Sequence, residues 1–97
     1  MLRLKDGVRL ANLQPQAVLA ITVAVTVWGD EDLTITSAND SIHSKTSLHY
    51  AGAAFDIRTN GITDPDGKAI LLEEALGIDY DVIYETDHIH VEYQPRR

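Results

Sequence analysis

The chain has 97 residues and no cysteine, and its 8 basic and 15 acidic side chains give a formal net charge of −7. This length suits one small domain over residues 1–97 with a single hydrophobic core. The negative charge argues against a nucleic-acid partner, which needs a basic face, and against attachment to an anionic membrane surface. Without cysteine there is no disulfide framework, thiolate zinc finger or cysteine nucleophile, so a metal site depends on the four histidines and the carboxylates.

The first clear pattern is an apolar run over residues 17–28, which follows three basic residues and superficially resembles an export signal. The run is too short to span a bilayer, and an acidic turn follows it instead of a small-residue cleavage site. We therefore interpret it as a buried element. Its valines and threonines would suit a strand, but Pro15 is typical of a first helical position and Gly29 of a helix stop. The sequence predicts a helix over Pro15–Trp28.

Further along, the pattern changes to short strands and turns. Apolar and polar side chains alternate over residues 33–37, and several of them are β-branched, as in a strand. Residues 53–58 predict a second strand, in which Phe55 and Ile57 share one face and Asp56 takes the other. The remaining expected elements are loops over 38–47 and 59–67, a helix over 68–76, and strands over 80–84 and 88–93 joined as a hairpin. This order predicts an α+β fold with a small antiparallel sheet and flanking helices.

All four histidines lie in two clusters that also hold carboxylates. The clusters comprise His43, His49 and Asp56, and Glu85, Asp87, His88 and His90. In a strand over 88–93, both histidines and Glu92 point to one face. Two histidines and an aspartate from two strands, with a spare carboxylate as general base, would suit a catalytic Zn²⁺ site. Hydrogen-bonded core histidines or surface histidines would give the same spacing, so the spacing alone leaves both interpretations open.

The segment SLHYAGAAFD over residues 47–56 resembles the S-x-H-x-x-G-x-A-x-D signature of the M15 zinc peptidases, and HIHVE over residues 88–92 resembles its second half. That family includes D-Ala-D-Ala carboxypeptidases and phage endolysins of the L-Ala-D-Glu type, and the hedgehog signalling domain shares the fold. The resemblance covers residues 33–93 and is nearest to the short, phage-encoded members. It implies a hedgehog-like fold and a zinc peptidase, either endopeptidase or carboxypeptidase, that hydrolyses peptidoglycan stem peptides.

Carried over residue by residue, the resemblance implies that His49, Asp56 and His90 hold the zinc. Asp87, three residues before the last ligand, takes the position of the general base, and Glu85 is the alternative from the hedgehog pattern. His43 and His88 would lie around the metal as supporting groups.

Many family members carry an arginine shortly after the first strand, where it helps to hold the substrate, but the corresponding segment here has none. Arg58 could take that role. Because a free carboxylate is harder to recognise without that cation, we favour an endopeptidase over a carboxypeptidase.

Two other functions stay open: a non-catalytic, zinc-stabilised binding module and a structural component of a phage. For the peptidase we expect a peptidoglycan peptide as the partner, with no nucleic acid and no membrane, and a monomer acting on the bacterial cell wall. The sequence does not indicate how the protein reaches the wall.

Overall fold

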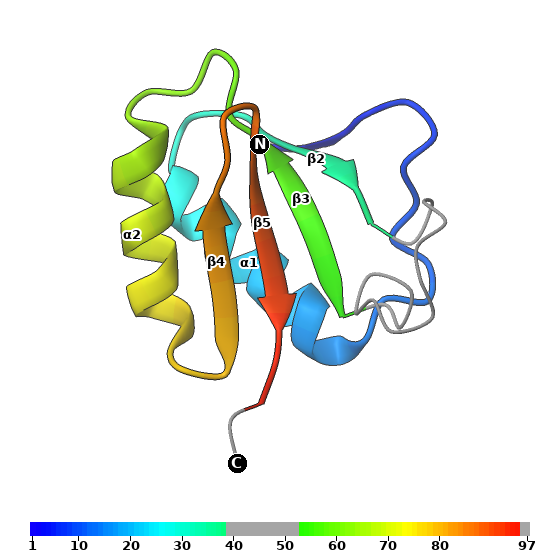
Figure 1. The fold of residues 1–97 in the computed structure, drawn as a ribbon. Helices are drawn as coiled ribbons and strands as arrows, with labels where there is room; N and C mark the ends of the chain where they lie inside the picture. The colour runs from blue at the N-terminus through cyan, green and yellow to red at the C-terminus, as the bar shows by residue number, and fades with distance from the viewer. Residues whose placement is uncertain (39–52, 96–97) are drawn as a thin grey trace.

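A mixed five-stranded sheet forms one layer of the protein, and α-helices cover one of its faces (Figure 1). The structure is a computed structural model, and it describes residues 1–38 and 53–95. The elements are β1 (Leu2–Leu4), α1 (Pro15–Trp28), β2 (Leu33–Ser37), β3 (Ala54–Arg58), α2 (Pro65–Leu76), β4 (Tyr80–Tyr84) and β5 (His88–Tyr93). The strand order is β1-β2-β3-β5-β4. The predicted α+β class is confirmed, and so are the four predicted strands, with β3 beginning one residue later than expected.

We predicted an antiparallel sheet, but the sheet is mixed, because β1 adds a parallel strand at one edge. Leu2 pairs with Leu33 and Leu4 with Ile35. The connection between β1 and β2 runs through α1, and a strand that returns to the sheet after such a crossover lies parallel to the first. Sequence reasoning missed β1 because it has only three residues, all exposed, so no alternation of apolar and polar side chains marks it.

Helix α1 has the predicted bounds, whereas α2 begins earlier than predicted. The helix expected over 68–76 begins at Pro65, within the stretch expected to be a loop. Asp64 caps this helix, since its side-chain oxygen accepts a hydrogen bond from the backbone N–H of Gly67 at 3.2 Å. Proline is well suited to the first helical turn, where its missing N–H has no partner to lose. The turn-like sequence around Pro65 is therefore the start of a helix.

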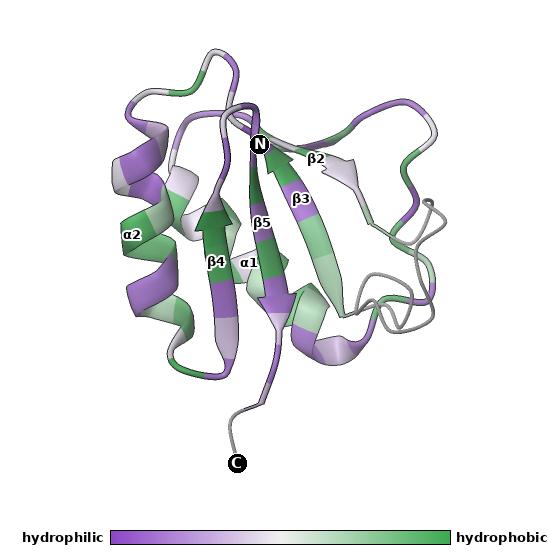
Figure 2. Cartoon of the chain, viewed as in Figure 1, coloured by the Kyte–Doolittle hydropathy of each residue, from purple (hydrophilic) through white to green (hydrophobic). Residues whose placement is uncertain are grey.

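The core lies between the helices and one face of the sheet. Successive side chains of β2, β3 and β5 point alternately to the two faces of the sheet. Those directed toward the helices are almost fully buried: Leu33, Ile35, Phe55, Ile57, Ile89 and Val91. Figure 2 shows the resulting alternation of hydrophobic and hydrophilic residues along β3 and β5. The residues between them point to the opposite face, which we call the polar face of the sheet. It contains Asp56, Arg58, His88, His90 and Glu92.

The apolar run over 17–28 is part of this core, as predicted. Ala17, Ala20 and Ala24 are buried, and their small side chains let α1 lie close to the sheet. Trp28 at the end of the helix is only 3% exposed. In the described parts of the chain, no helix combines the length and the apolar character needed to cross a membrane.

Candidate functional site

Asp56 and His90 form the centre of the polar face. They are directly opposite each other in the antiparallel pairing of β3 with β5, so their side chains leave the sheet on the same side. His90 Nδ1 and Asp56 Oδ1 are 2.8 Å apart. Both side chains are about four-fifths buried, with 20% and 19% exposed. The structure therefore brings together two of the three predicted metal ligands.

The second ring nitrogen of His90 also faces a carboxylate. Nε2 lies 2.8 Å from Oε1 of Glu92, which is two residues further along β5 on the same face. The hydrogen bond to Asp56 raises the pKa of His90 to about 9, because it outweighs the opposing effect of burial and is assisted by Glu92. At neutral pH the metal-free ring is therefore an imidazolium whose two N–H groups donate to two carboxylates.

A second histidine and two more carboxylates lie at the β4–β5 hairpin. His88 Nδ1 is 2.6 Å from Oδ1 of Asp87, and His88 Nε2 is 3.0 Å from Oε1 of Glu85. Burial disfavours the charged form of His88, but the hydrogen bond to Asp87 and the surrounding carboxylates together raise its pKa. The same hydrogen bond lowers the pKa of Asp87. Both candidates for the general base thus contact the same imidazole.

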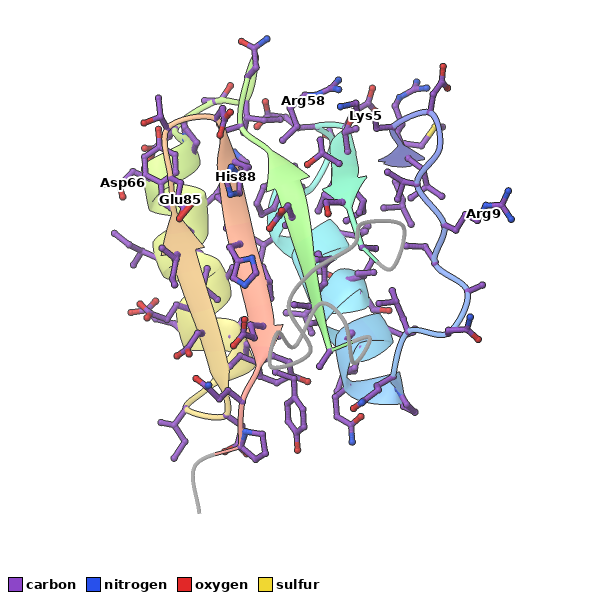
Figure 3. The ribbon with its side chains drawn as sticks, turned by 45° about the vertical axis from the view of Figure 1, so that its right-hand side comes forward. Lys5, Arg9, Arg58, Asp66, Glu85 and His88 are labelled. Carbon is purple, nitrogen blue, oxygen red and sulfur yellow. The ribbon has the colours of Figure 1, made fainter. Side chains whose placement is uncertain are left out.

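The two carboxylates differ in exposure but both reach solvent. Asp87, in the turn, has 86% of its side chain exposed, and Glu85 has 53%. Figure 3 shows Glu85 and His88 close together at this end of the sheet. Because His88 and His90 are two residues apart on one strand face, their backbones are about 7 Å apart. The candidate bases therefore contact the histidine that neighbours His90 along the polar face.

Arg58 lies at the end of β3, directly opposite His88 in the strand pairing. Its side chain is exposed. Figure 3 shows Arg58 and Lys5 at the same end of the sheet. Arg58 therefore adds a positive charge at the border of the carboxylate-rich part of the polar face.

The third predicted ligand, His49, and the predicted supporting residue His43 lie outside the described residues. Within residues 1–38 and 53–95, no three His, Cys, Asp or Glu side chains are grouped closely enough to hold a metal ion. The donor chemistry of the converging pair nevertheless fits Zn²⁺, which takes imidazole nitrogen and carboxylate oxygen. The segment that contains His49 leads directly into β3, which carries Asp56.

Sequence reasoning placed Glu92 on the correct face but did not identify it as a contact of a predicted ligand. The alternation of residues along β5 was the available signal, since it puts Glu92 beside His90. The orientation of the His90 ring, which decides the contact, has no signature in the sequence.

Comparison with known families relates the chain to a signalling domain. The sequence model of the hedgehog amino-terminal signalling domain matches residues 11–93, which include every element from α1 to β5. No curated protein matches the chain.

Proposed function

The chain belongs to the family of the hedgehog amino-terminal signalling domain, and on this basis we propose that it binds Zn²⁺ on the polar face and hydrolyses peptide bonds. The observation that carries the proposal is the convergence of Asp56 Oδ1 and His90 Nδ1 at 2.8 Å. The two candidate bases, Asp87 and Glu85, contact His88 at the β4–β5 hairpin, two residues before His90. A non-catalytic metal site has no need of accessible carboxylates beside its ligands.

The residues that would hold the metal are His49, Asp56 and His90. When bound, Zn²⁺ acts as a Lewis acid that polarises a carbonyl and makes water a stronger acid. Asp56 contributes negative charge, and His90 contributes a neutral nitrogen once its Nδ1 proton has left. The lost proton frees His90 Nδ1 from its bond to Asp56, so both donor atoms become available together.

Asp87 would accept a proton from the attacking water and return it to the leaving amine. Its lowered pKa keeps it a carboxylate at neutral pH, as a base must be. Oδ1 of Asp87 accepts from His88, which holds the carboxylate in place, and 86% of the side chain is exposed to solvent, from which the water would come. Glu85 is the alternative base, because it contacts the other nitrogen of the same ring.

We further propose peptidoglycan stem peptides as the substrate class, in the bacterial cell wall. Support comes from the resemblance of SLHYAGAAFD and HIHVE to the M15 signature, and from Arg58, which supplies a cation beside the site. Stem peptides carry carboxylates that such a cation would bind. We expect the protein to act as a monomer, without a nucleic-acid or membrane partner.

The experiment measures zinc content and peptide hydrolysis in the same preparations. Asp56→Asn and His90→Ala should lose both stoichiometric zinc and activity. Asp87→Asn should keep zinc and lose turnover, with Glu74→Gln on α2 as a matched change of charge away from the polar face. Turnover retained in Asp87→Asn but lost in Glu85→Gln would move the base to Glu85. Stoichiometric zinc in both ligand variants would refute the site.

A second candidate function is a zinc-stabilised binding module without catalysis, which the match to a signalling domain favours. In that case the metal would contribute folding free energy to a small domain. The hydrolysis measurement separates the two functions. Zinc bound at one equivalent without turnover by the wild-type chain would favour the module.

A further inference from the structure

We infer that Glu92 is a positioning residue, which fixes the ring of His90 so that Nδ1 rather than Nε2 faces Asp56 and receives the metal. The inference rests on the proposed zinc site and adds the residue that orients one of its ligands. The observation behind it is that His90 is held at both nitrogens, by carboxylates from two different strands.

The lengths of the two carboxylate side chains match the two ring nitrogens. Nδ1 is next to the ring carbon that joins the side chain, so it is reached by the short side chain of Asp56 directly opposite on β3. Nε2 is further from the backbone, and the longer side chain of Glu92 reaches it along β5. Turning the ring by a half-rotation would put carbon atoms in both positions and would break both hydrogen bonds. The two carboxylates therefore specify one ring orientation.

On the β4 side, the residue paired with His90 is apolar. Ile83 is directly opposite His90 on β4, and its side chain has no polar atom. The side chain of Glu92 is only 21% exposed, and partial burial strengthens a hydrogen bond to an ionised group. With a metal at Nδ1, the Nε2–H would continue to donate to Glu92. Such a carboxylate behind a ligating histidine orients the ring and raises its basicity.

The test is zinc affinity, measured by competition with a chelator on the full chain. Glu92→Ala should weaken zinc binding roughly 10- to 100-fold, the range found when an outer partner of a ligand is removed. Glu92→Gln keeps an oxygen that can accept from Nε2–H, so it should lose less than Glu92→Ala. Glu74→Gln makes the same change of charge on α2 and should leave the affinity unchanged.

A second readout follows the ring itself in the wild-type chain and does not depend on any variant. Nitrogen NMR of the zinc-loaded protein should show His90 with its proton on Nε2 and the metal on Nδ1. The metal on Nε2 would overturn the inference, because Glu92 would then compete with the metal for that nitrogen. Unchanged zinc affinity in Glu92→Ala would also overturn it, while leaving the zinc site intact. Failure of the wild-type chain to bind zinc would refute the proposed function and this inference together.

Discussion

Raising the pH should destabilise the metal-free protein through His90. Its pKa is about 9 in the folded chain, against an ordinary value of 6.5. Because the folded-state pKa is the higher one, the folded protein holds a proton that the unfolded chain has released between these two values. The stabilisation from the His90 imidazolium is therefore complete below pH 6.5. It is lost as the pH rises through about 9.

The size of the effect follows from the pKa difference. At about 1.4 kcal/mol for each unit, the shift from 6.5 to about 9 corresponds to about 3 kcal/mol of unfolding free energy. His88 changes the total in the same direction, because its pKa is also raised. Asp87 makes the fold more stable as the pH rises, because its pKa is lowered in the folded protein. This contribution changes only in acid, and it is fully present at every pH above the ordinary pKa of an aspartate. A fall of this size is a large part of the stability of a small domain.

The assay is urea unfolding in the presence of a chelator, at a series of pH values from 6 to 10. Trp28 is the sole tryptophan and is buried, so its fluorescence reports unfolding. Asp56→Asn removes the negative charge that makes the hydrogen bond to His90 favour the imidazolium, so the free energy of unfolding of this variant should fall less over this range. A wild-type free energy of unfolding that stays level or rises from pH 6.5 to 9 would show that the His90 imidazolium does not stabilise the fold.

Three other predictions concern the metal, the core and a helix cap. Zinc at 100 times its dissociation constant should raise the free energy of unfolding by about 2.7 kcal/mol, and Asp56→Asn should abolish this gain; equal stabilisation of both proteins would locate the metal elsewhere. In urea unfolding, Ile89→Ala should cost about 2 to 5 kcal/mol because the residue is fully buried under the helices. Ile83→Ala, on the exposed polar face, should cost less than about 1 kcal/mol, and similar losses at the two positions would contradict the assignment of faces. Asp64→Ala should cost about 1 kcal/mol through the lost cap of α2, whereas Asp64→Asn, which keeps an acceptor oxygen, should be close to neutral; equal effects would show that the hydrogen bond to Gly67 is not the cause.

The elements with internal periodicity could be predicted from the sequence. In β3 and β5 each side chain is directed either to the core or to the polar face, so the alternation of Phe55, Asp56 and Ile57 marks both the strand and its faces. The strand Leu2–Leu4 has no such alternation. It pairs with β2, from which it is separated in the sequence by the whole of α1. Three residues that are stabilised only by distant partners leave no local pattern.

The candidate site shows the same limit. The His-x-His spacing places His88 and His90 on one face, but the opposition of His90 and Asp56 depends on the register between two strands that are far apart in sequence. The contact with Glu92 depends in addition on a ring orientation. Residue types and faces were therefore accessible from the sequence, whereas the pairing of donor atoms required the structure.

The most direct test of a catalytic site on the polar face is the incubation of the zinc-loaded wild-type chain with purified peptidoglycan stem peptides, followed by mass spectrometry. Our central prediction is cleavage at one peptide bond, with a new amino terminus, and no formation of product once a chelator has removed the metal. A chain that carries one equivalent of zinc and leaves the stem peptides intact would contradict it.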